Sequence, residues 1–281
     1  MTTDHGQHRF ETQTLDPGKA RGIHLWKLPK TAARARVLVV HGMGEHSRRY
    51  DHVATTLADA GFDVTLFDLR GHGRSAGIRG DIGRYEEFID DLQAVFDLTA
   101  SEGLPVFLYA HSFGAQLVIR FVMERNPAIA GAVLASPWLA LAYRPHPLKL
   151  AIAGLVRKVW PGLRQQSGLP REFLSRDRDF MTSMPDLDLT HTLISARLFF
   201  MLIENAAKAL DGAPNFHAPF LLLHGDDDHI TSPAASREFF EKASSTDKTL
   251  KLYPGTRHET HNDLNRAEVL ADVVAWLKAR I

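Results

Sequence analysis

Short apolar runs alternate with longer amphipathic stretches along most of the chain. Six runs are rich in leucine or β-branched residues and are bounded by Gly, Pro or Asp, which is typical of buried strands. They are Arg36–His41, Asp63–Leu69, Pro105–His111, Ile129–Ala135, Pro219–His224 and Thr249–Tyr253. Nearly continuous apolar runs favour a parallel sheet that is covered on both faces. His8–Thr14 and Gly22–Leu28 predict an antiparallel pair of strands at the N-terminal edge.

The stretches between the strands place apolar residues at helical spacing, as Phe88, Leu92 and Val95 do. The predicted helices are Arg49–Ala60, Tyr85–Ser101, Ser112–Arg125, Ser232–Lys242 and Asn262–Ala279. Ser232 followed by Pro233 fits a helix N-cap with proline at the first helical position. Strands that alternate with helices imply right-handed βαβ units, so the fold class is α/β with a doubly wound sheet.

One region breaks the alternation. Residues 138–216 contain no clear strand, several prolines, and helical patterns near Leu148–Trp160 and Thr190–Leu210. We interpret this region as a helical cap inserted into a core formed by residues 1–137 and 217–281. The cap is expected over the carboxyl edge of the sheet, where ligands bind in open α/β folds.

Composition narrows the class of protein. The 281 residues include 33 Lys and Arg and 33 Asp and Glu, so the formal net charge is zero. A protein that binds nucleic acid usually carries an excess of basic residues, and this chain has none overall. The chain has no cysteine, which excludes a thiol nucleophile and a cysteine zinc site. Its start, MTTDHGQHRFETQ, has no apolar segment, and no run is long and apolar enough to span a membrane. We therefore expect a cytoplasmic protein; its oligomeric state stays open.

The strongest local indication of chemistry lies where the predicted strand Pro105–His111 meets the predicted helix Ser112–Arg125. Ala110-His111-Ser112-Phe113-Gly114 has the form small-x-Ser-x-Gly, which is typical of the turn that exposes a nucleophilic serine in α/β enzymes. Small flanking residues are needed because strand and helix pack closely there. The alternative is that Ser112 merely caps the helix.

A nucleophilic serine needs a base and a group that orients the base. Two loops after the last two predicted strands supply acids and histidines, in Asp226–Asp228 and around His258. Glycines of His41-Gly42-Met43-Gly44 follow the first buried strand and let backbone N–H groups approach a ligand. The N–H groups of Met43 and Phe113 are candidates for an oxyanion hole. Taken singly, each of these segments also fits an ordinary surface loop.

Five motifs together resemble the monoacylglycerol lipase and lysophospholipase branch of the α/β-hydrolases, which are hydrolases of the serine aminopeptidase S33 type. They are HGMGEHSRRY (41–50), DLRGHGRSAGIRG (68–80), AHSFGA (110–115), HGDDDHITSP (224–233) and YPGTRHETHND (253–263). The resemblance covers nearly the whole chain outside the insertion. It implies an α/β-hydrolase fold, with a mostly parallel eight-stranded sheet and a helical cap or lid.

The resemblance also assigns roles. It implies that Ser112 is the nucleophile, Asp228 the acid and His258 the base, with Met43 and Phe113 as oxyanion donors. The family spacing selects Asp228 over its two acidic neighbours and His258 over His261. Two departures stand out: Ala110 replaces the first glycine of the elbow, and Met184 falls where the family often has a tyrosine near the glycerol. Six residues are expected to contact substrate: Gly42, His111, Leu155, Val159, Met184 and Leu198.

The expected function is hydrolysis of acyl esters, of monoacylglycerol or a similar lipid, with water as the second substrate and no cofactor or metal. Lysophospholipase, small-ester carboxylesterase, thioesterase and S33-type peptidase activities share this machinery, and a non-catalytic binding protein on the same fold is a further alternative. Apolar cap residues suggest an acyl tunnel. Cations such as Lys149 and Lys158 on the first cap helix suggest transient contact with a membrane surface, although a solvated face explains them as well.

Overall fold

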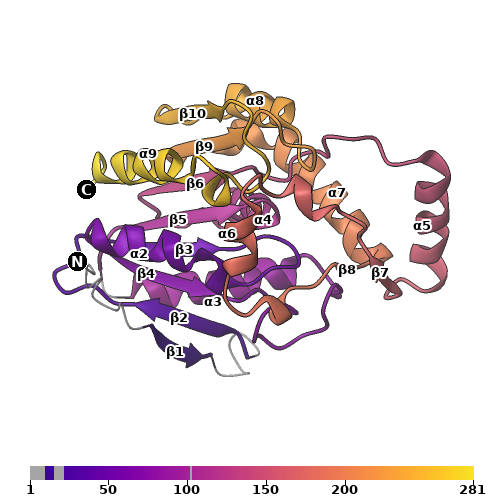
Figure 1. Ribbon diagram of the computed structural model, residues 1–281, viewed down its shortest axis with the longest axis horizontal. Coiled ribbons are helices and arrows are strands. Elements are labelled where there is room, and N and C mark those ends of the chain that lie inside the picture. Colours follow the sequence, from indigo (N-terminus) through magenta and orange to yellow (C-terminus); the bar gives the residue numbers. More distant parts are fainter. Residues whose placement is uncertain (1–9, 16–21, 102) are drawn as a thin grey trace.

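The computed structural model describes residues 10–15, 22–101 and 103–281. Its main feature is an eight-stranded sheet in the order β1-β2-β4-β3-β5-β6-β9-β10 (Figure 1). The strands are β1 Glu11–Thr14, β2 His24–Leu28, β3 Ala35–Val40, β4 Phe62–Phe67, β5 Val106–His111, β6 Gly131–Ala135, β9 Phe220–Gly225 and β10 Lys248–Tyr253. Strand β2 is antiparallel to β1 and β4, and the remaining pairs are parallel. The predicted α/β sheet is confirmed.

The strand predictions hold closely. All six predicted buried strands are present, and their ends differ from the predicted ones by at most two residues. The predicted antiparallel pair is also present, with Thr14 opposite His24, although residues 8 and 9 of the first strand lie outside the described residues. Buried apolar side chains therefore position strands β2 to β6 and β9, whereas β10 is mostly half-buried and β1 is exposed.

Helices cover both faces of the sheet because the strands are apolar on both faces. Along β3, Val37 and Val39 join one core cluster, and Leu38 and Val40 join the other. The first cluster includes side chains of α2 (Asp51–Asp59) and α9 (Arg266–Lys278), and the second those of α3 (Glu86–Ala100), α4 (Phe113–Arg125) and α8 (Pro233–Lys242). Each fully buried Val or Leu contributes about 1.5–3 kcal/mol relative to exposure.

Helix boundaries follow local hydrogen bonds. The Ser232 side chain accepts from the N–H of Ala235, which confirms the predicted N-cap of α8. In contrast, α9 begins at Arg266 rather than at Asn262. Residues Thr260–Asn262 form a short 3₁₀ turn, η5, and the buried Asp263 that follows binds the Arg176 side chain and the N–H of Arg257. These side-chain bonds replace the first helical turn.

The segment between β6 and β9 lies outside the sheet and includes α5 at the far end of the molecule (Figure 1). Its elements are α5 Pro147–Val159, β7 Arg164–Gln166, η2 Arg171–Phe173, α6 Arg178–Ser183, η3 Leu187–Leu189, β8 Leu193–Ser195, α7 Ala196–Asp211 and η4 Ala213–Asn215. We call this segment the cap.

The prediction that the cap has no strand is wrong. Strands β7 and β8 pair antiparallel, with Arg164 opposite Ser195, so their backbone groups satisfy each other. The predicted helix from Thr190 is wrong at its start for the same reason, because α7 begins only at Ala196. Ser195 ends β8 and caps α7 by accepting from the N–H of Leu198, at 3.0 Å.

Candidate active site

Ser112 occupies the turn between β5 and α4 with a backbone φ of +53° and ψ of −117°. A non-glycine residue in this region is strained, and such strain collects at functional sites. The turn is tight because a Cβ on Gly114 would overlap the carbonyl oxygens of His41 and Val40, so only glycine fits there. The Ser112 hydroxyl makes no capping hydrogen bond to α4, so the interpretation as a simple helix cap is wrong.

The Ser112 hydroxyl instead contacts a histidine from a distant loop. His258 Nε2 lies 2.9 Å from Ser112 Oγ, and His258 Nδ1 lies 2.7 Å from Asp228 Oδ2. The three residues come from loops after β5, β9 and β10, and all three are buried. Parallel strands end at one edge of the sheet, which is why residues so far apart in sequence meet there.

The competing acids and histidine do not reach this hydrogen-bonded series. Asp226 accepts from the N–H of Gly255, at 2.6 Å, and Asp227 pairs with His229. His261 stacks on Tyr50, with ring centroids 4.7 Å apart. The structure thus brings Asp228 and His258 to Ser112 and leaves the alternatives in structural contacts.

Asp228 is held as an anion by several donors. Oδ1 accepts from the backbone N–H groups of Ile230 and Thr231, and Oδ2 accepts from the Thr231 hydroxyl at 2.8 Å. Burial alone would raise the pKa of Asp228, but the charge on His258 and the hydrogen bonds from His224 and His258 hold that pKa well below its usual range.

The imidazole of His258 is shifted in the opposite direction. Burial alone would lower its pKa, but the Asp228 carboxylate, through its charge and its hydrogen bond, raises the pKa of His258 above the ordinary value of 6.5. A histidine with this partner takes up a proton readily, and its orientation is fixed through Nδ1. The arrangement can therefore remove a proton from the Ser112 hydroxyl.

The two candidate oxyanion donors come from two turns that meet at Ser112: Phe113 follows Ser112 directly, and Met43 follows Gly42, which lies against the Ser112 side chain. Among the described residues, neither the N–H of Met43 nor that of Phe113 has a hydrogen-bond partner. The loop that carries Met43 is fixed from within, because the N–H of Gly42 donates to Glu45 Oε1 at 2.5 Å. It is also fixed from the cap, because the N–H of His191 donates to the carbonyl of Gly44 at 2.7 Å.

A buried ion-pair bridge joins this loop to the histidine loop. The Arg49 guanidinium bonds Glu45 Oε2 at 2.9 Å through Nε and Glu259 Oε2 at 2.7 Å through Nη2. None of these three residues is predicted as a site residue from the sequence. The signal was present, since Glu45 and Arg49 lie in the motif HGMGEHSRRY and Glu259 follows His258 directly.

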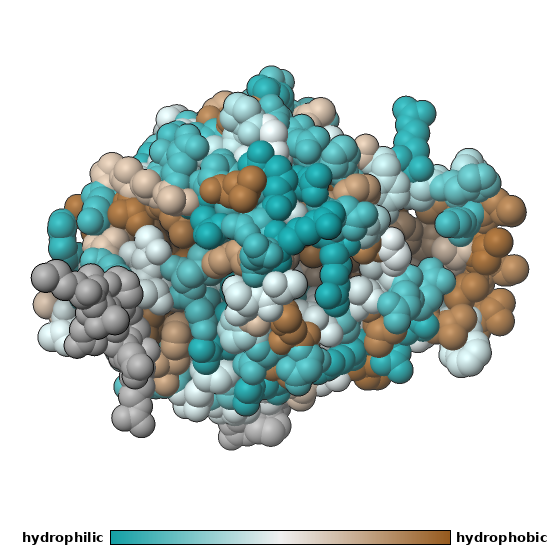
Figure 2. All heavy atoms as spheres, viewed as in Figure 1, coloured by the Kyte–Doolittle hydropathy of each residue, from teal (hydrophilic) through white to brown (hydrophobic). Residues whose placement is uncertain are grey.

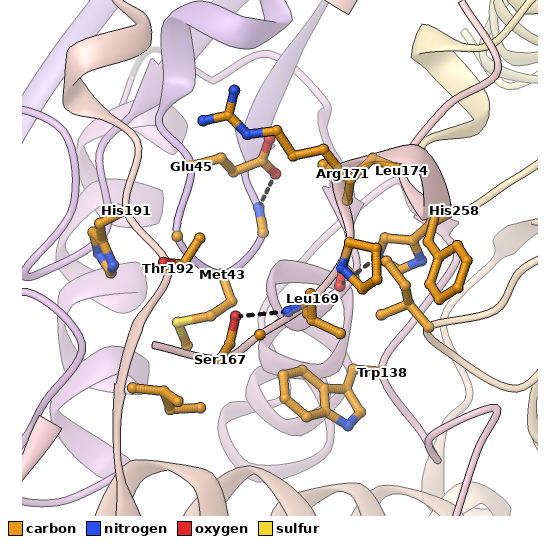
Figure 3. Close-up of a pocket in the computed structure, with 18 of the residues that line it drawn as sticks. Met43, Glu45, Trp138, Ser167, Leu169, Arg171, Leu174, His191, Thr192 and His258 are labelled. Atoms are coloured by element: carbon orange, nitrogen blue, oxygen red, sulfur yellow. Dashed lines mark hydrogen bonds between the residues drawn. The ribbon is translucent and has the colours of Figure 1, made fainter. Parts of the chain in front are cut away.

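A cavity of about 1020 Å³ opens above Ser112, between the sheet edge and the cap. Met43, Trp138 and His258 are arranged around it (Figure 3). Its apolar lining includes Trp138, Leu141, Leu150, Leu169, Ile194 and Phe199. Its polar lining includes Glu45, Arg49, Arg171 and Glu259, and Figure 3 shows Glu45 and Arg171 across the cavity from Trp138.

Two of the six expected substrate contacts, Gly42 and His111, line this cavity. The other four do not. Leu155 and Val159 are 62% and 78% exposed, because α5 turns Lys149, Leu150 and Ala153 toward the cavity instead. Leu198 lies on the buried face of α7 and packs in the hydrophobic core, and Met184 is buried but is not part of the cavity lining.

An eight-stranded, mostly parallel sheet that carries a Ser–His–Asp series at its carboxyl edge defines an α/β-hydrolase. The chain belongs to the serine aminopeptidase S33 family, whose model matches residues 31–265.

Individual relatives agree with this assignment. The chain is 31% identical over 276 residues to the monoacylglycerol lipase of Mycolicibacterium smegmatis, covering 97% of this chain and 98% of that protein. It is 34% identical over 255 residues, 90% of its length, to an uncharacterized abhydrolase domain-containing protein of Dictyostelium discoideum, but spans only 27% of that protein. The crystal structure of the Paleococcus ferrophilus monoacylglycerol lipase has a TM-score of 0.84 at 35% identity, covering 92% of this chain and 99% of that one.

The raised pKa of His258 predicts how ester hydrolysis depends on pH. A base acts only when it is unprotonated, so activity should be lost as pH falls through the folded-state pKa of His258. We expect kcat/KM for a soluble ester to show an acid limb with an apparent pKa above 6.5. Initial rates between about pH 5 and pH 9 at constant ionic strength test this. A limb well below 6.5 would contradict the assignment.

Proposed function

We propose that this chain is a serine ester hydrolase that cleaves monoacylglycerol or a closely related lipid ester through an acyl-enzyme intermediate. The observation that carries the proposal is the hydrogen-bonded series Ser112–His258–Asp228 at the floor of a large, mainly apolar cavity. The similarity to monoacylglycerol lipases across nearly the whole chain supports the lipid substrate.

In the acylation step, Ser112 Oγ attacks the ester carbonyl and its proton moves to His258 Nε2. Asp228 holds the Nδ1–H and stabilises the imidazolium. The N–H groups of Met43 and Phe113 would bind the developing oxyanion, and each such donor is typically worth about 10²–10³ in rate. His258 then gives its proton to the leaving alcohol. Water, deprotonated by His258, attacks the Ser112 ester; the bond to Oγ breaks, His258 returns the proton to Ser112 Oγ, and the acid is released.

The cavity lining separates the two ends of such a substrate. The apolar wall that includes Trp138 and Phe199 suits an acyl chain. The leaving alcohol must lie beside His258, where Glu45 and Glu259 also reach the lining. Both carboxylates are already bonded by Arg49 and other donors, so they make this end of the cavity polar rather than supply free acceptors. A polar end of this kind suits the glycerol of a monoacylglycerol better than it suits a second acyl chain.

Hydrolysis of p-nitrophenyl esters from acetyl to palmitoyl tests both the nucleophile and the apolar wall. We expect kcat/KM to rise with chain length, since each buried methylene contributes about 0.8 kcal/mol. Ser112→Ala should lower it by at least about 10³-fold at every length. The matched control is Ser183→Ala, which replaces an exposed serine of α6 that is not part of the cavity lining. A preference for acetyl would contradict the lipid substrate, and activity that survives Ser112→Ala would contradict the nucleophile.

The outer face of the cap is apolar. Leu148, Ile152, Leu155 and Val159 recur at helical spacing on α5 and are 54–78% exposed. Figure 2 shows this hydrophobic patch at the end of the molecule where α5 lies in Figure 1. None of the described helices is long and apolar enough to cross a bilayer. We propose that the α5 face inserts shallowly into a lipid surface, as amphipathic helices do, and so brings the cavity to its substrate.

Vesicle binding tests this contact. Leu155→Ser combined with Val159→Ser should weaken binding to phosphatidylcholine–phosphatidylglycerol vesicles about tenfold or more, because two exposed apolar anchors are lost. Hydrolysis of soluble p-nitrophenyl butyrate should stay at the wild-type rate. Ile78→Ser is the control, since Ile78 is 58% exposed but lies in the core domain. Equal binding by wild type and the double variant would contradict the proposal.

A further inference from the structure

A second imidazole contacts Asp228. His224, the penultimate residue of strand β9, is fully buried, and both of its ring nitrogens have partners. Nε2 lies 3.0 Å from Asp228 Oδ2, and Nδ1 lies 2.8 Å from the Ser236 hydroxyl on α8. The mechanism above does not use this side chain. Such a buried and fully bonded histidine needs a reason beyond filling space.

The hydrogen bonds determine which nitrogen carries the proton. An ionised carboxylate can only accept, so His224 Nε2 must donate to Asp228. Nδ1 of a neutral ring is then an acceptor, and the Ser236 hydroxyl is placed to donate to it. Helix α8 thus selects the His224 tautomer that faces Asp228 with an N–H.

Asp228 Oδ2 is consequently shared. Its partners are His258 Nδ1 at 2.7 Å, the Thr231 hydroxyl at 2.8 Å and His224 Nε2 at 3.0 Å. Every donor to this oxygen draws negative charge away from the others, so the bond from His224 weakens the pull of Asp228 on the proton of His258.

We propose that His224 is a positioning residue, which fixes the Asp228 carboxylate through a second imidazole and limits how tightly His258 retains its proton. The inference rests on the proposed function, because it concerns the same base. As a consequence, His258 stays unprotonated at a lower pH than it would if Asp228 bonded His258 and not His224.

The other ionisable groups near His258 do not explain such an effect through Asp228. Glu45 and Glu259 also raise the pKa of His258, but Arg49 binds both of them. The His111 ring lies 4.8 Å from that of His258, and its nitrogens face Glu45 and the His258 carbonyl. Within the described residues, His224 is the one ionisable side chain besides His258 that hydrogen-bonds Asp228.

A set of variants at position 224 tests the inference. His224→Leu removes the donor at similar volume, so more of the Asp228 charge acts on His258. We expect the acid limb of kcat/KM to move upward by about 0.5–1 pH unit. His224→Gln keeps an N–H near the position of Nε2 and should leave the limb within about 0.3 unit of wild type. Ser236→Ala removes the hydrogen bond that fixes the His224 tautomer and should move the acid limb upward by a smaller amount.

Controls separate this role from a structural one. His46→Leu replaces another fully buried histidine, one whose ring nitrogens have no hydrogen-bond partner among the described residues, and should leave the acid limb in place. A lower kcat with an unmoved limb in both His224→Leu and Ser236→Ala would overturn the inference, as would an equal shift in His224→Gln. If His224→Leu does not fold, Ser236→Ala and His224→Gln still decide the matter.

An NMR titration of the His258 imidazole in ¹⁵N-histidine-labelled protein gives the same comparison without substrate. The His258 pKa should rise in His224→Leu and Ser236→Ala and stay near wild type in His224→Gln. This measurement remains decisive even if the esters tested are not hydrolysed, so failure of the proposed function and failure of this inference are distinguishable.

Discussion

The carboxylate of Asp228 is buried, and a buried carboxylate is stable as an anion only when donors satisfy both of its oxygens. Here the backbone of the loop after β9, the Thr231 hydroxyl and two imidazoles supply those donors. Because His258 is one of them, the loop after β10 is held against the loop after β9. The position of His258 beside Ser112 thus depends on satisfying this one buried charge.

A second buried charge system holds the rest of the site together. Arg49 ties the loop of Met43 to the histidine loop through Glu45 and Glu259. The cap is attached to the same two loops, since the N–H of His191 bonds Gly44 and the N–H of Glu259 bonds the carbonyl of Leu174. Removing one member of such a buried pair leaves an uncompensated charge, so these contacts act as a unit. They connect cap position to the geometry around Ser112.

Much of this architecture follows from sequence pattern. Six apolar runs predict six strands because a sheet buried on both faces needs apolar residues at nearly every position. The turn at Ser112 can also be predicted from the sequence, because the close packing of strand against helix requires a glycine at position 114. Family spacing, rather than local pattern, singles out Asp228 and His258 from their neighbours. The distances from His258 to Ser112 and Asp228 agree with that choice.

Other features could not be predicted, for physical reasons. Strands β7 and β8 are three residues long, which is too short for any hydrophobic period. Helix α5 has apolar residues on two sides, so its pattern does not say that Leu150 faces the cavity and Leu155 faces outward. The roles of Arg49 and His224 depend on burial and on partners far away in sequence, neither of which a single sequence displays.

The central claim is that Ser112 is a nucleophile activated through His258 and Asp228. Covalent labelling by a fluorophosphonate, read by peptide mass spectrometry, tests it most directly because it needs no knowledge of the natural ester. We expect a single phosphonylated residue, Ser112, and a rate of labelling that falls by roughly 10²-fold or more in Asp228→Asn. Labelling at another residue, or equal rates in wild type and Asp228→Asn, would contradict it.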